Sequence, residues 1–234
     1  MAATIEALRR EVLAAHLAIF ESGLARFTFG NASAIDRERG VVIIKPSGVP
    51  YHALTPAKMV ACNLDGTLAS GSLRPSSDLP THLVLYRAFA EIGGIVHTHS
   101  ETAVAWAQAG REIPCFGTTH ADYFHGPVPV TEALTTTDVA GAYEANTGES
   151  IVRRFQGIDP LRVPAVLVRS HASFCWGPTV EQAVECAEVL EMVARMARDT
   201  IALNPGVEPI PAALLDRHFL RKHGKDAYYG QPER

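Results

Sequence analysis

Apolar residues recur along the chain with two different spacings. Over residues 4–22 they fall on one face of a helix and charged residues occupy the other, so the pattern predicts an amphipathic helix. Residues 34–45 contain a β-branched run after the polar turn at 36–40, which predicts two short paired strands. A second hairpin is expected where residues 59–63 lead into the Asp65-Gly66 turn.

Strands and helices alternate through the remainder of the chain. Short strands are predicted at 95–99, 163–168 and 174–176, and helices at 76–93, 102–109, 136–155, 179–204 and 211–223, with a further helix start at Thr55-Pro56. The alternation is irregular, which favours a mixed or antiparallel sheet over a doubly wound one. Because neither a repeat nor a long linker interrupts it, we expect residues 1–234 to form a single domain that ends in a polar tail at 225–234.

Composition narrows the class of protein. With 234 residues, 47% of them hydrophobic, the chain can bury a sizeable core. A formal charge of -4 without a basic block argues against nucleic-acid binding, and no apolar run is long enough to span a membrane. The four scattered cysteines include no CxxC pair, and the opening segment does not resemble a signal peptide, so we expect a cytoplasmic protein with reduced thiols.

Three histidines are the strongest sign of chemistry. His97 and His99 lie two apart on a predicted strand, so both imidazoles face the same side. Such a pair alone is more often structural than metal-binding. His171 follows the apolar run 166–168 and adds a third imidazole at a predicted strand end. Three imidazoles leave a position on zinc open for substrate oxygens, which is typical of catalytic zinc.

Asp78 follows two serines at a predicted helix start. Taken alone, it is best interpreted as a helix cap. The free N–H groups and hydroxyls of Ser76 and Ser77 also form a suitable anion site. Asp78 and His82, four residues apart on one helix, are a weaker candidate ligand pair, since His82 could equally be a packed residue.

Other polar segments are harder to interpret from spacing. The loops at 30–33 and 45–48 are ordinary turns when taken singly, but with the two serines they offer N–H groups, hydroxyls and one ammonium suited to a phosphate. The segments 118–123 and 227–231 are rich in groups able to move protons. Sequence spacing does not place them relative to the histidines.

Several motifs, in order along nearly the whole chain, resemble the class II aldolase/adducin family, and most closely its pentulose-phosphate epimerases. They are GNASAIDRERG at 30–40, IKPSGV at 44–49, RPSSDLPTH at 74–82, IGGIVHTHS at 92–100, GTTHADYF at 117–124, and LLDRHFLRKHG with AYYGQ near the end. The ordered agreement is far more specific than an isolated HTH.

The resemblance implies a three-layer α/β/α fold with a central, mainly antiparallel sheet, assembled as a homotetramer with active sites between subunits. It also implies one divalent metal per subunit, expected to be Zn²⁺. By matching motifs, the metal ligands would be Asp78, His97, His99 and His171. The residues that hold the substrate and its phosphate would be Gly30, Asn31, Lys45, Ser47, Gly48, Ser76 and Ser77. A neighbouring subunit would supply Asp122 and Tyr229 as the acid/base pair, and the tail at 225–234, which contains Tyr229, is expected to dock on the adjacent subunit.

The activity implied by the resemblance is interconversion of L-ribulose 5-phosphate and D-xylulose 5-phosphate by retro-aldol cleavage and re-addition. An aldolase of the L-fuculose-1-phosphate type is the alternative, but Asp at 78, where such aldolases carry Glu, and the HADYF segment favour the epimerase. A non-enzymatic adducin-like interaction domain is disfavoured by the retained histidines. Arg169, in place of a histidine, and Ala172-Ser173, in place of Gly-Pro, depart from the family pattern.

Overall fold

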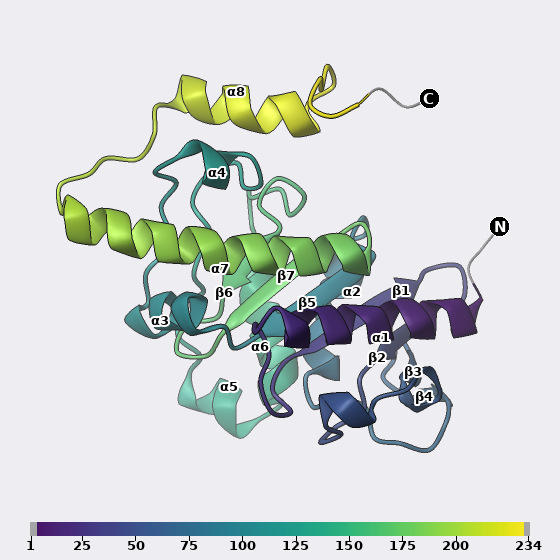
Figure 1. The fold of residues 1–234 in the computed structure, drawn as a ribbon. Helices are drawn as coiled ribbons and strands as arrows, with labels where there is room; N and C mark the ends of the chain where they lie inside the picture. The colour runs from purple at the N-terminus through teal and green to yellow at the C-terminus, as the bar shows by residue number, and fades with distance from the viewer. Residues whose placement is uncertain (1–3, 232–234) are drawn as a thin grey trace.

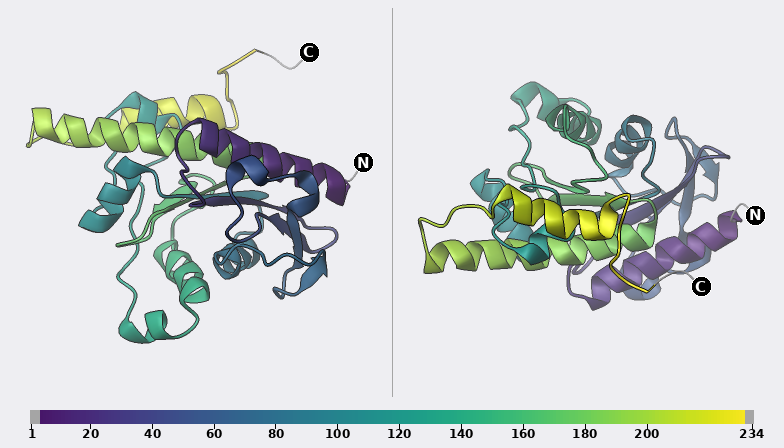
Figure 2. Two further views of the ribbon diagram at one scale, coloured as in Figure 1. Left: turned by 60° about the horizontal axis from the view of Figure 1, so that its bottom comes forward. Right: turned by 90° about the horizontal axis from the view of Figure 1, so that it is seen from above.

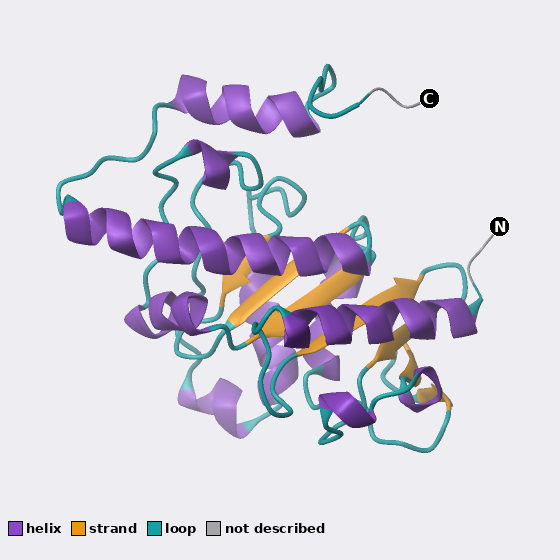
Figure 3. Cartoon of the chain, in the orientation of Figure 1, coloured by secondary structure: helices purple, strands orange, loops and turns teal. Residues whose placement is uncertain are grey.

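A seven-stranded antiparallel sheet forms the middle layer of the protein, which is represented by a computed structural model that describes residues 4–231. The strand order is β4-β3-β2-β1-β5-β7-β6, and every neighbouring pair is antiparallel. Figure 3 shows the strands running between two sets of helices. The strands are β1 (Asn31–Asp36), β2 (Val41–Ile44), β3 (Val60–Asn63), β4 (Leu68–Ser70), β5 (Gly94–Thr98), β6 (Ala165–Leu167) and β7 (Ser173–Gly177).

Helices cover both faces of the sheet, as Figure 1 and Figure 2 show. One face packs against α1 (Ile5–Glu21), α3 (Glu101–Ala109) and α7 (Val180–Leu203), and the other against α2 (Leu79–Ala88) and α6 (Tyr143–Arg154). The remaining elements are α4 (Thr118–Ala121), α5 (Thr136–Ala140), α8 (Ala212–His223) and two 3₁₀ turns, η1 (Tyr51–Ala53) and η2 (Pro56–Lys58). The expected three-layer α/β/α fold with an antiparallel sheet is therefore confirmed.

Alternation along the strands creates two hydrophobic cores. In β2, Ile43 packs into the core under α1 and α7, whereas Val42 and Ile44 pack into the core under α2 and α6. This is the period-two arrangement of side chains that a pleated strand imposes. Both faces of the central strands are buried, which explains why the sequence there is a continuous apolar run.

Some predicted elements differ in detail. The helix expected over 136–155 is two helices, because Gly141 leaves the helical region with ψ -132° after a short capped helix. The start at Thr55-Pro56 yields only a 3₁₀ turn, and α4 was not predicted. The helix expected to run to Gly93 ends at Ala88 instead, because Phe89 turns away to pack 5.3 Å from the ring of Trp176.

The C-terminal helix lies outside the main layers, beside α4 (Figure 1). Its one buried side chain is Phe219, and the segment before it is tied down by a hydrogen bond from the Ile210 N–H to the Cys115 carbonyl. Residues 225–231 of the expected tail follow it, after the C-cap residue Gly224, and 232–234 are outside the described residues. Between residues 4 and 231, no helix is both long enough and apolar enough to cross a membrane.

Gly94 allows β5 to lie against the start of α7, which leads to a stability prediction. A Cβ at this position would lie 2.3 Å from the Val180 Cα, so backbone would have to move. We expect Gly94→Ala to lower the free energy of unfolding by about 3 kcal/mol, as overpacking does in tight cores. Urea denaturation measures this. Gly206→Ala, whose nearest neighbour would be 3.8 Å away, is the control, and equal effects of the two substitutions would contradict the prediction.

Candidate metal centre and substrate cleft

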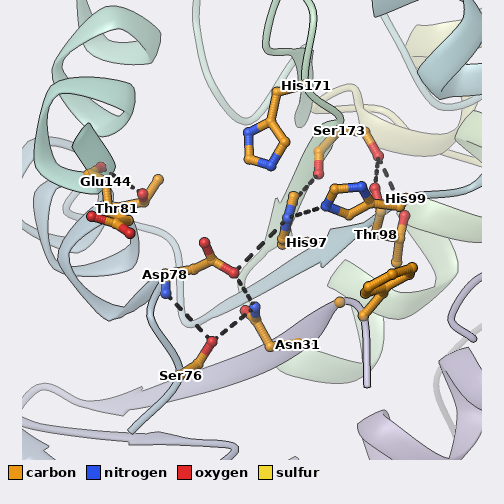
Figure 4. Close-up of polar contacts among 12 residues, drawn as sticks. Asn31, Ser76, Asp78, Thr81, His97, Thr98, His99, Glu144, His171 and Ser173 are labelled. Carbon is orange, nitrogen blue, oxygen red and sulfur yellow. Dashed lines mark hydrogen bonds and ion pairs between the residues drawn. The ribbon is translucent and has the colours of Figure 1, made fainter. Parts of the chain in front are cut away.

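The three predicted histidines converge on one point. Their ligand nitrogens all lie within 4.8 Å of one another (Figure 4). His97 lies inside β5, His99 follows the end of that strand, and His171 lies in the loop between β6 and β7. Sheet register brings the segments together, because β5 pairs with β7 and places His97 opposite Phe174.

Hydrogen bonding and burial leave one nitrogen of His97 available to bind a cation. Its Nδ1 lies 2.9 Å from the Ser173 carbonyl oxygen, which can only accept, so Nδ1 carries the proton and Nε2 keeps its lone pair. The ring stacks on Phe174 with 4.3 Å between centroids. Burial lowers the pKa of His97 to about 4 and also lowers the pKa values of His99 and His171. All three imidazoles are therefore neutral near pH 7, as metal binding requires.

Asp78 does not cap α2 with its side chain. It adopts a helical conformation at the start of the helix, and no capping hydrogen bond is found in the described part of the chain. Instead, its Oδ2 accepts a 2.6 Å hydrogen bond from the Asn31 amide and lies 3.9 Å from the His97 Nε2. Burial opposes ionisation, but His97, His82 and the Asn31 amide together bring the pKa of Asp78 below its ordinary value. A carboxylate therefore faces the three imidazoles.

His82 is a packed residue and not a member of the histidine group. It is fully buried, and its Nδ1 hydrogen-bonds the Ser33 hydroxyl at 2.7 Å, which in turn hydrogen-bonds the Tyr86 hydroxyl at 2.8 Å. The geometry therefore does not support the weaker idea of an Asp78–His82 ligand pair. Three neutral imidazole nitrogens with one nearby carboxylate are a donor set that suits zinc and similar divalent metals.

A cleft of about 400 Å³ opens beside the histidines. It is lined by Thr28, Phe29, Gly30, Asn31, Lys45, Ser47, Gly48, Ser76, Ser77, Asp78, His97, His99 and His171. Every residue that the resemblance assigned to the metal, the substrate or the phosphate is in this set. One small cleft thus gathers segments that lie far apart in the sequence.

Polar atoms in the cleft are placed to receive a ligand. Lys45 is buried, its Nζ donates to the Thr28 carbonyl at 3.0 Å, and burial lowers its pKa while Asp78 opposes the shift. The buried Asn31 Oδ1 has no hydrogen-bond partner among residues 4–231. Gly30 has φ +76°, and a Cβ there would lie 2.9 Å from the His97 carbonyl oxygen, so this position needs glycine.

Asp122 and Tyr229 lie near each other but do not line the cleft. Asp122 forms a 2.8 Å ion pair with Arg221 and is 3.7 Å from the Lys222 Nζ. The ring of Tyr229 lies 5.1 Å from the Arg221 guanidinium and 4.6 Å from the Lys222 Nζ. Burial opposes ionisation of Asp122, but hydrogen bonds from Arg221 and His218 bring its pKa below the ordinary value. Within one chain, this pair belongs to the surface formed by α4 and α8.

Two residues near these sites were not singled out from sequence. His218 donates from Nδ1 to Asp122 at 3.0 Å, and the Tyr143 hydroxyl lies 3.5 Å from the His171 Nδ1. His218 was visible only within the LLDRHFLRKHG motif. For Tyr143, which starts α6, the sequence carried no signal, because the contact joins elements 28 residues apart.

The two departures from the family pattern leave the histidine group intact. The Arg169 side chain packs against Gly110 at the end of α3, where a Cβ would lie 3.0 Å from its guanidinium carbon. Ser173 supplies the carbonyl that orients His97, and the Ala172 carbonyl accepts from the Val168 N–H at 2.8 Å, closing the turn around His171.

Fold and site together define a class, and the comparisons agree with it. The chain belongs to the class II aldolase and adducin N-terminal domain family, whose sequence model matches residues 10–198. It is 49% identical to L-ribulose-5-phosphate 4-epimerase UlaF of Salmonella paratyphi A over 227 residues, which are 97% of this chain and 100% of that protein. The chain is 48% identical to the enzyme of the same name from Salmonella choleraesuis, again over 97% of this chain and 100% of that protein.

Solved structures agree on the fold. An L-fuculose 1-phosphate aldolase superposes with a TM-score of 0.75 at 24% identity, covering 90% of this chain and 93% of the other. The L-fuculose 1-phosphate aldolase from Glaciozyma antarctica PI12 superposes with a TM-score of 0.76 at 18% identity, covering 97% of this chain and 87% of the other. At these identities the likeness establishes shared architecture only.

The position of Asp78 allows a test of whether its side chain binds a metal or caps α2. Because its side chain makes no capping bond, Asp78→Asn should leave the melting temperature of the metal-free protein unchanged. Metal affinity should fall about tenfold or more, because a charged oxygen beside the imidazoles is lost. Competition with a coloured chelator measures the dissociation constant. Asp138→Asn alters the carboxylate of a true capping box in α5 and is the matched control. Unchanged affinity in Asp78→Asn would show that this carboxylate is not a ligand.

Proposed function

We propose that this protein is an L-ribulose-5-phosphate 4-epimerase, which interconverts L-ribulose 5-phosphate and D-xylulose 5-phosphate. The observation that carries the proposal is 49% identity over the full length of a relative with that name. The fold alone would not distinguish an epimerase from an aldolase, because L-fuculose 1-phosphate aldolases share it. The cleft has the size and the polar lining that a small phosphorylated sugar requires.

The cleft divides into a metal end and a phosphate end. We assign Asp78, His97, His99 and His171 as ligands of one divalent metal, for which we propose Zn²⁺. When bound, the metal would act as a Lewis acid toward the ketose oxygens. At the other end, the substrate groups would be held by Gly30, Asn31, Lys45, Ser47, Gly48, Ser76 and Ser77. The N-terminus of α2 and the ammonium of Lys45 both favour the negative phosphate.

Inversion of the configuration at carbon 4 of the pentulose phosphate requires cleavage of a carbon–carbon bond. The hydrogen of carbon 4 is not next to a carbonyl, so it is not acidic enough for direct removal. When the bond between carbons 3 and 4 breaks and a base takes the proton of the 4-hydroxyl, carbon 4 becomes an aldehyde. The electron pair of the broken bond moves toward the carbonyl at carbon 2, so the three-carbon fragment becomes an enediolate that can attack the aldehyde again. If the two-carbon aldehyde fragment turns before the bond forms again, its oxygen takes up a proton on the opposite side, and the configuration is inverted. The reaction therefore needs a proton acceptor and a proton donor on two faces of the cleft.

Asp122 and Tyr229 are our candidates for these two roles. They lie side by side around Arg221 and Lys222, yet they do not line the cleft of their own chain. We therefore propose a homotetramer in which the pair from one subunit completes the cleft of a neighbour. A small sugar phosphate as substrate also fits a location in the cytoplasm, which forms part of the proposal.

Incubation of the metal-loaded protein with L-ribulose 5-phosphate tests the proposed function. We expect D-xylulose 5-phosphate to form without accumulation of free glycolaldehyde phosphate, with both compounds followed by ¹³C and ³¹P NMR. Release of both fragments would identify an aldolase instead. Absence of turnover together with absence of metal binding would indicate an adducin-like interaction domain. His97→Asn, which removes a ligand nitrogen, is the inactive control.

Mixed oligomers test whether the site is shared. Tyr229→Phe should lower turnover about 10²- to 10⁴-fold, the range for loss of a general acid or base, with metal content unchanged. If Asp122 and Tyr229 serve a neighbour, mixing Tyr229→Phe with His97→Asn after reversible dissociation should restore part of the activity. Mixing Tyr229→Phe with Asp122→Asn should not, because every completed cleft would still carry one defect. No recovery in the first mixture, with subunit exchange confirmed by mass spectrometry, would contradict the shared site.

A further inference from the structure

A buried carboxylate from α7 binds the first turn of α3. Glu191 lies in the middle of α7 and is 8% exposed. Its Oε1 accepts a hydrogen bond from the Thr102 N–H and its Oε2 accepts one from the Ala103 N–H, both at 2.9 Å. A negative charge that receives two N–H groups at a helix N-terminus is a strong interaction, because it combines charge-assisted hydrogen bonds with the helix dipole.

This carboxylate takes the place of the local helix cap. Ser100 is the N-cap residue of α3, and a serine there normally accepts from the second or third N–H of the helix. Both of those N–H groups are occupied by Glu191, and the buried Ser100 hydroxyl has no partner in the described part of the protein. The start of α3 is therefore fixed by a residue 89 positions further along the chain.

The helix start lies directly beside a candidate metal ligand. β5 ends at Thr98 and α3 begins at Glu101, so only His99 and Ser100 connect them. The direction in which α3 leaves the sheet therefore determines where the His99 backbone lies. Figure 4 shows His99 at this strand end, close to His97.

The position of the His99 ring depends more on the backbone than the position of the His97 ring does. His97 lies within the sheet ladder and its Nδ1 is bound by the Ser173 carbonyl. The ring of His99 contacts His97, His171 and Phe29, and across residues 4–231 no hydrogen bond from its Nδ1 is found. No polar partner on Nδ1 orients the ring. The position of His99 therefore depends on the backbone of residues 99 and 100, which join β5 to α3.

We propose that Glu191 is a positioning residue for His99, and that it sets metal affinity from outside the cleft. The inference rests on the proposed metal site, and it adds a residue that touches neither metal nor substrate. Loss of its charge should allow the first turn of α3 to shift and should displace His99 from the other two ligands. Residues that orient metal ligands typically change affinity by about 10- to 100-fold when they are replaced.

Glu191→Gln is the test variant, because glutamine has nearly the same shape but only one oxygen to accept the two N–H groups. We expect the dissociation constant of the metal, measured on Zn²⁺ with a competing chelator, to rise about tenfold or more. Trp106→Phe is the matched control: it removes the 3.0 Å hydrogen bond from the Trp106 Nε1 to the Ala194 carbonyl, which joins the same two helices further along α3. This control should lower the melting temperature of the metal-free protein and leave metal affinity unchanged.

The outcomes separate positioning from mere stabilisation. Glu191→Gln with a lower melting temperature but wild-type affinity would overturn the proposal, as would an equal loss of affinity in Trp106→Phe. If Glu191→Gln alone does not fold, Glu191→Asp replaces it, because aspartate keeps the charge but its shorter side chain does not reach both the Thr102 and the Ala103 N–H groups. A dissociation constant for Zn²⁺ about tenfold above the wild-type value in that folded variant would support the proposal, and wild-type affinity would overturn it. If the wild-type protein binds no metal, the proposed function itself is refuted. This measurement is made before any variant is prepared.

Discussion

The register of β5 between β1 and β7 is the constraint on which the site depends. It places His97 opposite Asn31 on one side and Phe174 on the other. Asn31 holds Asp78 toward the imidazoles, and Phe174 stacks on the ring of His97. A slip of one residue would turn His97 to the opposite face of the sheet, away from its partners. Two buried cores, one on each face, oppose such a slip.

Burial has a second consequence for chemistry. It keeps the three imidazoles neutral, so they are ready to bind a cation without first losing protons. The same burial would be costly for Asp78 without the groups around it, and the Asn31 amide stabilises its negative charge. The metal end that we propose for the cleft is thus arranged by residues of a single chain. The proton-transferring residues that we propose lie on the outer surface, where a second copy of the chain would have access.

Sequence alone predicted what depends on local pattern. The β-branched run at 41–44 predicted a buried central strand, and HTH on a strand predicted that His97 and His99 face the same side. The resemblance extended this to the set of residues that the cleft brings together. The capping interpretation of Asp78 was wrong, because its side chain makes no capping hydrogen bond and is held by the Asn31 amide instead. Glu191 gave no signal, since its bonds to α3 join residues almost ninety positions apart and exist only after α7 has packed.

X-ray absorption spectroscopy of the protein loaded with one equivalent of Zn²⁺ tests the central claim most directly. If sheet register and loop placement bring the ligands together as described, the spectrum should show three imidazole nitrogens bound to each zinc at about 2.0 Å, with the remaining ligands oxygen. His99→Asn should reduce the imidazole number from three to two. A wild-type spectrum with fewer than three imidazoles, or with sulfur among the ligands, would contradict the account.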